Sequence, residues 1–307
     1  MPRQLTLAGR AASLDRRRAL IYLTLIILIL SPFIASLVSL DNEKRRTVEA
    51  RDLPELYVLA VEGLNLTAGS IRIGEEPPGA AYNYSVEAYE GLEGFQAPSV
   101  PGFLGNISKT VEAYRTVAQS GIVLYNSSQT ILDAIDGARS VTESLRQCRI
   151  QEALEEWGRV KPAIDAAKKA LQEALDTVTS VNPDYLLANE HRAVVRDTVI
   201  LLLALQDNLE RLEETMKIVE SNAGDLEKLC NGEPTRKGIE AALDIASIAR
   251  GAQGPSPLRI DMLGLSTAFA ALGQQGTGGE AGPNAPIISG GGQGGMGAGY
   301  GVPPSDD

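Results

Sequence analysis

The stretch that decides the fold is VILLLALQDNLERLEETMKIVESNAGDLEKLC, which runs from Val199 to Cys230. Because an α-helix turns once in about 3.6 residues, apolar residues spaced three or four positions apart lie on one side of it. The residues with this spacing are Val199, Leu202, Leu205, Leu209, Leu212, Met216, Val219, Ala223, Leu226 and Cys230. Such a stripe is buried against other helices, so the segment predicts one helix of a bundle or coiled coil.

Two more stripes of the same kind precede this one. The first consists of Val117, Leu124, Ser127, Ile131, Ala134, Ala138, Val141, Leu145 and Cys148, and the second of Ala153, Trp157, Val160, Ile164, Ala167, Leu171, Ala174, Val178 and Val181. The first stripe gives way to the second at Gln147–Arg149. Asn182-Pro183 separates the second helix from the third, because the residue before a proline disfavours helix, asparagine caps a helix start and proline suits the first helical turn. Short connections make neighbouring helices antiparallel, so the sequence predicts an all-α, coiled-coil-like bundle of three or four antiparallel helices over residues 105–272.

Several residues modify this helical pattern. Pro162 predicts a kink in the second helix or a delayed start. Gly224, within Ser221–Asp225, is suited to a left-handed helix cap, so we expect the third helix to break there. A further helix is expected over about 235–250, and the apolar segment 258–272 is expected to pack as a short helix.

The two cysteines of the chain, Cys148 and Cys230, both lie on apolar stripes. In an unbroken third helix Cys148 would lie beside about residue 216, which leaves Cys230 roughly 20 Å further along the helix. A disulfide requires Cα atoms about 4.4–6.8 Å apart. An intrachain disulfide therefore requires the break near Asn222 to fold the last turn back, and an interchain disulfide or free thiols are the alternatives.

Residues 19–40 form an apolar segment without a charged residue. As a helix it is about 33 Å long, enough to cross a hydrocarbon core of about 30 Å. The basic segment 1–18 contains five arginines and one aspartate, and this bias predicts a cytoplasmic N-terminus. The sequence thus predicts a single-pass protein of the cell membrane whose bulk is extracytoplasmic.

Two other interpretations of this segment stay open. One is a cleaved secretory signal, although the best small-residue cleavage site, near Ile34–Ser36, is poor. In the other, Arg18-Ala19 before the apolar run resembles the processing site of archaeal prepilin-like signal peptides, which implies a pilin-like subunit of a surface filament. All three interpretations export residues 41–307.

Four N-x-S/T sequons lie on the exported side, before residue 130. They begin at Asn65, Asn83, Asn106 and Asn126. Such tripeptides are acceptors for N-linked glycans when they are exposed in an exported protein, although any single match also arises by chance. The sequence therefore nominates the four asparagines as glycosylation candidates.

The segments that flank the predicted bundle differ from it in composition. Residues 41–104 show little helical periodicity and are expected to form a juxtamembrane linker, with a possible short helix at Leu53–Leu64 and a brief strand at Ile71–Ile73. Residues 273–307 contain 13 of the 31 glycines. They have too few apolar groups to offset the entropy lost on ordering, so this tail is expected to be disordered.

Composition narrows the possible functions. With a formal net charge of -11, one histidine and two cysteines in 307 residues, the chain is a poor candidate for nucleic-acid binding or a His/Cys metal site. His191 is expected to be a solvated surface residue, and the spacing of Glu152, Glu155 and Glu156 is that of a solvated helix face. No nucleophile–base pair is found, and the G-x-G-x-x-G match at Gly292, Gly294 and Gly297 has no strand pattern before it and no helix pattern after it. We therefore expect a protein that is not an enzyme and binds no cofactor.

The leading hypothesis is a membrane-anchored scaffold or interaction protein of the cell envelope. It would contact a protein partner, or a second copy of itself, through its helical faces. The alternative hypotheses are a ligand-sensing ectodomain that works with a separate signalling or transport partner, and the filament subunit described above.

Overall fold

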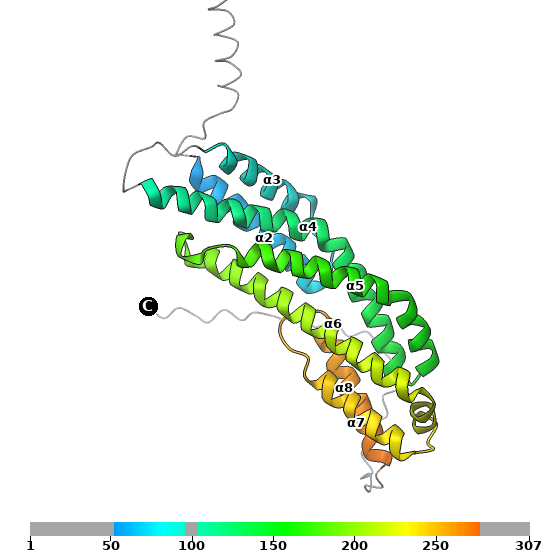
Figure 1. Ribbon diagram of the computed structural model, residues 1–307. Helices are drawn as coiled ribbons and strands as arrows, with labels where there is room; N and C mark the ends of the chain where they lie inside the picture. The colour runs from blue at the N-terminus through cyan, green and yellow to red at the C-terminus, as the bar shows by residue number, and fades with distance from the viewer. Residues whose placement is uncertain (1–51, 96–103, 277–307) are drawn as a thin grey trace, which may run out of the picture.

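The computed structural model describes residues 52–95 and 104–276 (Figure 1). Over this part the chain is all-helical, without strands. Its elements are α2 (Leu53–Ile73), α3 (Gly79–Glu93), α4 (Leu104–Arg146), α5 (Ile150–Thr179), the 3-10 turn η1 (Pro183–Tyr185), α6 (Asn189–Cys230), α7 (Arg236–Arg250) and α8 (Leu258–Gly276). The predicted segments 1–18 and 19–40, and the tail beyond Gly276, lie outside the described residues.

The three longest helices form the predicted antiparallel hairpin. α4 packs extensively against α5, and α5 packs against α6 (Figure 1). α4 and α6 make only a small direct contact with each other. At about 1.5 Å per residue, the 43 residues of α4 make a helix about 65 Å long. The bundle built around it is elongated, and we call the bundle the rod (Figure 1). α5 continues through Pro162 as one helix, so the delayed start considered for it is wrong.

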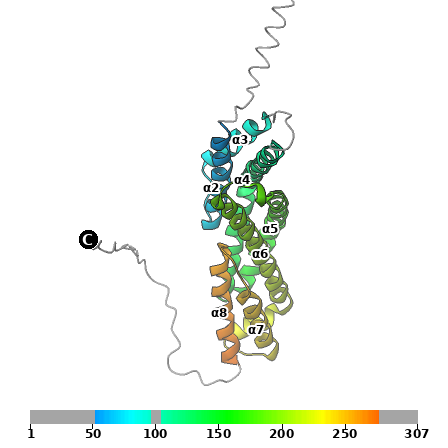
Figure 2. The ribbon, with the colours of Figure 1, turned by 90° about the vertical axis from the view of Figure 1, so that its left-hand side faces the viewer.

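Two shorter helices complete a four-helix cross-section. α2 packs against both α4 and α6 in one half of the rod, and α8 packs against the same two helices in the other half. Figure 2 shows α2 and α8 following one another along the same side. α3 packs outside α2 and α4, and α7 packs outside α6 and α8. The fourth position of the bundle is therefore filled by two helices in line.

The linker expected over 41–104 is wrong where the structure describes it, because α2 and α3 belong to the bundle. Ile71 is a buried residue of the last helical turn of α2 and not part of a strand. Gly63 of α2 lies so close to α3 that a Cβ atom there would lie 2.8 Å from the carbonyl oxygen of Ala81. α3 therefore packs on α2 through small residues, with its buried positions at Ala81, Ser85, Ala88 and Leu92.

The break in α6 is at Asn222 instead of Gly224. Asn222 has non-helical angles, φ −128° and ψ 19°, and its side-chain amide donates to the carbonyl oxygen of Ile218 at 2.9 Å. Gly224 is not among the residues with positive φ in the described chain. The expected kink is present, but it arises from a side chain that competes for a helical carbonyl and not from a left-handed glycine.

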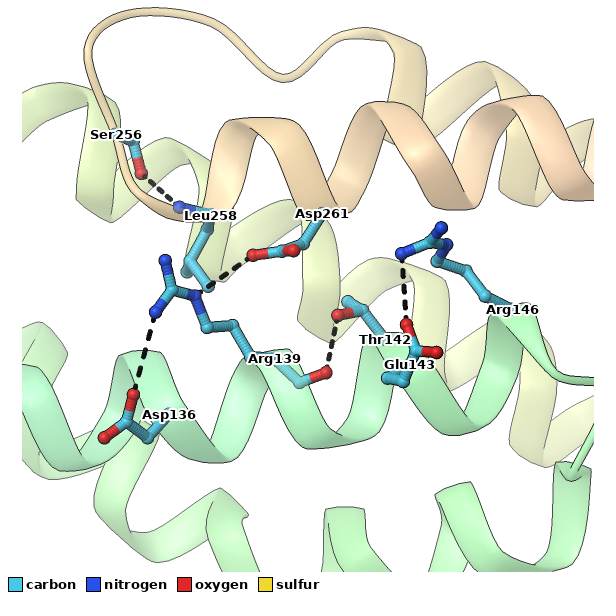
Figure 3. Close-up of polar contacts among 8 residues, drawn as sticks. All are labelled: Asp136, Arg139, Thr142, Glu143, Arg146, Ser256, Leu258 and Asp261. Atoms are coloured by element: carbon cyan, nitrogen blue, oxygen red, sulfur yellow. Dashed lines mark hydrogen bonds and ion pairs between the residues drawn. The ribbon is translucent and has the colours of Figure 1, made fainter. Parts of the chain in front are cut away.

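An ion pair links α4 to α8 where the half of the rod that contains α2 meets the half that contains α8. Arg139 of α4 donates from Nε to Oδ2 of Asp261 in the first turn of α8, at 3.2 Å (Figure 3). The same guanidinium lies next to Gly74, which ends α2 with a left-handed φ of 76°. A cation beside the C-terminus of one helix and an acidic side chain in the first turn of the next both complement the helix dipoles. Arg139 thus helps to fix where α2 ends and α8 begins.

Candidate functional site

The sequence-predicted cysteines come together at one end of the rod. Cys148, between α4 and α5, is bonded to Cys230 at the end of α6, with a Cα–Cα distance of 5.8 Å. The kink at Asn222 redirects the last turns of α6, as this pairing requires. The intrachain disulfide is confirmed, and we call this end of the rod the disulfide end.

Cys148 also terminates α4. Its φ of 57° is left-handed, and it is the one residue other than glycine with positive φ in the described chain. Its N–H donates to Leu145 at 3.0 Å, and the N–H of Arg149 donates to Ser144 at 2.9 Å. This pair of hydrogen bonds is a Schellman cap, in which glycine is the usual residue at the position of Cys148. Cys148 therefore forms the cross-link while it adopts a left-handed backbone conformation, which is unfavourable for any residue that has a side chain.

A buried polar cluster lies at the opposite end, which we call the α2 end. The fully buried ring of Tyr114 on α4 stacks on Tyr57 of α2, with ring centroids 4.1 Å apart. The Tyr114 hydroxyl lies 2.6 Å from Nδ1 of His191 on α6 and accepts a hydrogen bond from the N–H of Leu187 at 2.9 Å. The cluster thus connects α2, α4 and the start of α6 through one side chain.

Hydrogen bonding and burial together favour the neutral form of this cluster. The Tyr114 oxygen accepts from Leu187 and lies 2.6 Å from Nδ1 of His191, which donates or accepts according to the tautomer of the imidazole. Burial lowers the pKa of His191, and the nearby Glu190 partly offsets this shift. Burial likewise raises the pKa of Tyr114, and burial together with Tyr114 raises the pKa of Tyr57 to about 12. The cluster is therefore uncharged at neutral pH.

The prediction that His191 is a solvated surface residue is wrong. Its ring is half-buried and meets the Tyr114 ring edge-on, with centroids 5.5 Å apart. The two residues are 77 positions apart, so no local spacing could reveal the contact. The sequence does indicate that Tyr114 is buried, because it lies three residues before Val117 and continues the first apolar stripe.

The sequon asparagines lie on helices and not in loops. Asn65 of α2, Asn83 of α3 and Asn126 of α4 are exposed. Asn106 is in the first turns of α4, and its side chain lies outside the described part. The rings of Tyr82 and Tyr125, each one residue before a sequon, contact each other at 5.1 Å, which places Asn83 and Asn126 on neighbouring helices.

A shallow hollow of about 340 Å³ adjoins the α2 end, between α4 and the connection from α5 to α6. Lys109 extends over the ring of Tyr185 there, 5.3 Å from its centroid. The other lining residues are polar or small, and they are Glu112, Ala113, Thr116, Ser180 and Asn182. The hollow can receive a small polar molecule through hydroxyl, ammonium and carboxylate groups.

The glutamates of α5 make structural contacts. Glu156 accepts hydrogen bonds from Ser140 at 2.9 Å and from Ser144 at 3.0 Å, and so connects α5 to α4. Glu152 pairs with Arg149 at 2.6 Å. Among the residues that the structure describes, no group of three or more His, Cys, Asp or Glu side chains is arranged to hold a metal ion. Within those residues no helix combines the length and the apolar character needed to cross a bilayer.

Comparisons with known proteins do not assign this arrangement to a family. No protein-family model matches the chain, and no curated protein or solved structure is significantly similar to it.

Proposed function

We propose that this chain is a membrane-anchored, extracytoplasmic scaffold of the cell envelope, which holds a partner at a fixed distance from the membrane. The observation that carries the proposal is a long helical rod with one continuous core and a disulfide at one end. Disulfides persist in oxidising compartments, so the cross-link supports export. The apolar segment 19–40 supplies the anchor in this proposal.

A partner needs a surface, and α6 offers a candidate. Ile200 and Leu203 are 44% and 49% exposed on this helix, a large exposure for aliphatic side chains that share one helix face. These two residues lie outside the buried stripe of α6, and they provide an apolar contact for another helix, from a partner or from a second copy.

The experiment has two parts. In intact cells, external protease should remove the folded rod while a tag before residue 19 stays protected, and intact mass should show an oxidised cysteine pair. Chemical cross-linking in the same cells should capture a specific partner or a dimer through α6. A double variant, Ile200→Ser with Leu203→Ser, should lose that cross-link, whereas Ile260→Ser, which changes a 79% exposed residue of α8, should keep it. A cytoplasmic chain with free thiols would refute export, and cross-links that survive the double variant would refute this face.

A second candidate function is a ligand-sensing ectodomain, which the hollow at Lys109 and Tyr185 favours. A ligand that binds the folded state stabilises it by RT ln(1 + L/Kd), where L is the free ligand concentration, so the melting temperature rises with the logarithm of that concentration once it exceeds the dissociation constant. A screen of small polar metabolites should then stabilise the wild type but not Lys109→Ala, with Lys161→Ala as a control on α5. A screen without any stabilising compound would contradict this function and leave the scaffold proposal intact.

A further inference from the structure

Three of the four sequons share an unusual pattern of exposure. Their asparagines are exposed, but the hydroxyl residues two positions later are buried: Thr67 and Ser85 are 0% exposed and Ser128 is 5% exposed. Each of these sequons lies entirely within a helix, in α2, α3 and α4 respectively. The fourth sequon also lies in a helix, at the start of α4, and it differs in one respect, because its hydroxyl residue, Ser108, is exposed.

Packing and hydrogen bonds hold the three buried hydroxyl groups in place. Thr67 donates to the carbonyl oxygen of Gly63 at 2.9 Å, and Ser128 donates to that of Tyr125 at 2.7 Å. Ser85 lies where α3 approaches both α2 and α4 closely, because a Cβ atom on either Gly63 or Gly121 would clash with its Oγ atom. None of these hydroxyl groups can reach a second protein without separation of the helices.

The chemistry of N-glycosylation needs those groups. An oligosaccharyltransferase forms a bond between the asparagine Nδ2 and C1 of the sugar and breaks the bond between C1 and the lipid diphosphate. The lipid diphosphate leaves as an anion, and the amide proton passes to solvent. The enzyme contacts the hydroxyl group of the sequon, so a sequon whose hydroxyl group is enclosed between packed helices is out of its reach until the helices separate.

We propose that Asn65, Asn83 and Asn126 accept glycans only before α2, α3 and α4 pack together, whereas the Asn106 sequon remains an acceptor on the folded chain. The proposal rests on the export proposed above, and its co-reactant is a lipid-linked oligosaccharide diphosphate. The exposure of the three asparagines means that a glycan attached early points into solvent after folding. Glycan transfer therefore precedes helix packing at three sites.

The test uses the purified full chain, a single-subunit oligosaccharyltransferase that accepts N-x-S/T, and its lipid-linked oligosaccharide. One sample is folded with its disulfide intact, and the other is reduced, carboxymethylated and kept unfolded in urea that the enzyme tolerates. Peptide mass spectrometry measures occupancy at each asparagine. We expect occupancy of Asn65, Asn83 and Asn126 to be at least about tenfold lower in the folded sample, with Asn106 similar in both.

A matched pair of variants separates packing from sequence. Gly63→Ala should push α3 away from α2 and raise occupancy of Asn65 and Asn83 in the folded sample, whereas Gly69→Ala, which meets nothing within 4 Å, should leave it low. Equal occupancy of the three sites in folded and unfolded chains would overturn the proposal, as would no transfer to them in the unfolded chain or suppression of Asn106 by folding. Since the purified enzyme requires no export, these outcomes are independent of the cell-based test of location.

Discussion

At the scale of single residues, Tyr114 combines several interactions in one buried side chain. Its ring contributes burial and stacking, while its hydroxyl satisfies a backbone N–H and an imidazole nitrogen at the same time. Removing the hydroxyl costs both of these hydrogen bonds, and because the partners are only partly accessible to water, solvent replaces the bonds incompletely. The α2 end of the rod should therefore be sensitive to changes that leave its apolar packing untouched.

Tyr114→Phe is expected to lower the free energy of unfolding by about 0.5–1.5 kcal/mol, because the N–H of Leu187 and Nδ1 of His191 lose their partner. Urea denaturation followed by circular dichroism measures the change. Tyr125→Phe is the matched control on the same helix, since the contact of its ring with Tyr82 does not need the hydroxyl, and it should change stability by less than about 0.5 kcal/mol. Equal losses in the two variants would contradict a special role for the Tyr114 hydroxyl.

His191 makes stability depend on pH. Its pKa in the folded chain lies below the ordinary value of 6.5 because burial disfavours the charged ring. Between the folded pKa and 6.5 the unfolded chain binds more protons, so the free energy of unfolding should rise with pH across that window. The stabilisation is complete above 6.5 and is lost as the pH falls through the folded pKa. Urea titrations at several pH values should show this slope, and His191→Gln should abolish it; an unchanged slope in the variant would refute the assignment.

At the scale of helices, close packing of small residues decides how α2 meets α3. Gly63→Ala is expected to destabilise the fold by about 1–3 kcal/mol, because the new methyl group meets the backbone of α3 at Ala81 and Ser85. Gly69→Ala on the same helix faces open space and should stabilise by about 0.5–1 kcal/mol through helix propensity. Thermal unfolding of both variants distinguishes these effects, and stabilisation by both would contradict the close approach.

The junction between α4 and α5 allows a second test at this scale. In a Cys230→Ser background without the cross-link, Cys148→Gly should be more stable than Cys148→Ala by about 1 kcal/mol, since only glycine adopts the left-handed φ of 57° without strain. At the preceding residue, where φ is not positive, the order should reverse, with Gln147→Ala more stable than Gln147→Gly. Denaturant melts of the four variants measure both differences, and the same order at the two positions would contradict the cap.

These helices also show what a sequence can reveal. α4, α5 and α6 follow from stripes of apolar residues, and α7 and α8 were expected as short helices after them, because helical periodicity and apolar composition are local properties. α3 was missed because its buried positions include Ala81, Ser85 and Ala88, which do not form a strongly apolar stripe. The contact between Tyr114 and His191 depends on tertiary packing, which no local spacing reports. The bend in α6 was predicted within Ser221–Asp225, and only the residue responsible, Asn222 instead of Gly224, differs.

At the scale of the whole molecule, the disulfide joins two residues, Cys148 and Cys230, that are 82 positions apart in the sequence. Cross-linking removes conformations from the unfolded chain, and for a loop of this length the chain-entropy model gives about 4–5 kcal/mol of stabilisation. Because this term acts on the unfolded state, it should reach all parts of a cooperative fold, including the α2 end far from the cysteines. A local cross-link that only prevented fraying of α6 would instead leave the α2 end unchanged.

The last prediction separates these two possibilities. The double variant Cys148→Ser with Cys230→Ser should lose about 4–5 kcal/mol of unfolding free energy, and reduced wild type should lose a similar amount. Hydrogen exchange under native conditions reports where the loss occurs. If the rod is one cooperative unit, protection should fall by the same factor around Tyr114 and around Cys230. Protection that falls only in the last turns of α6 and in α7 would show that the two halves, joined through Arg139, unfold separately, and that the α2–α3 half can stay folded while the disulfide end opens.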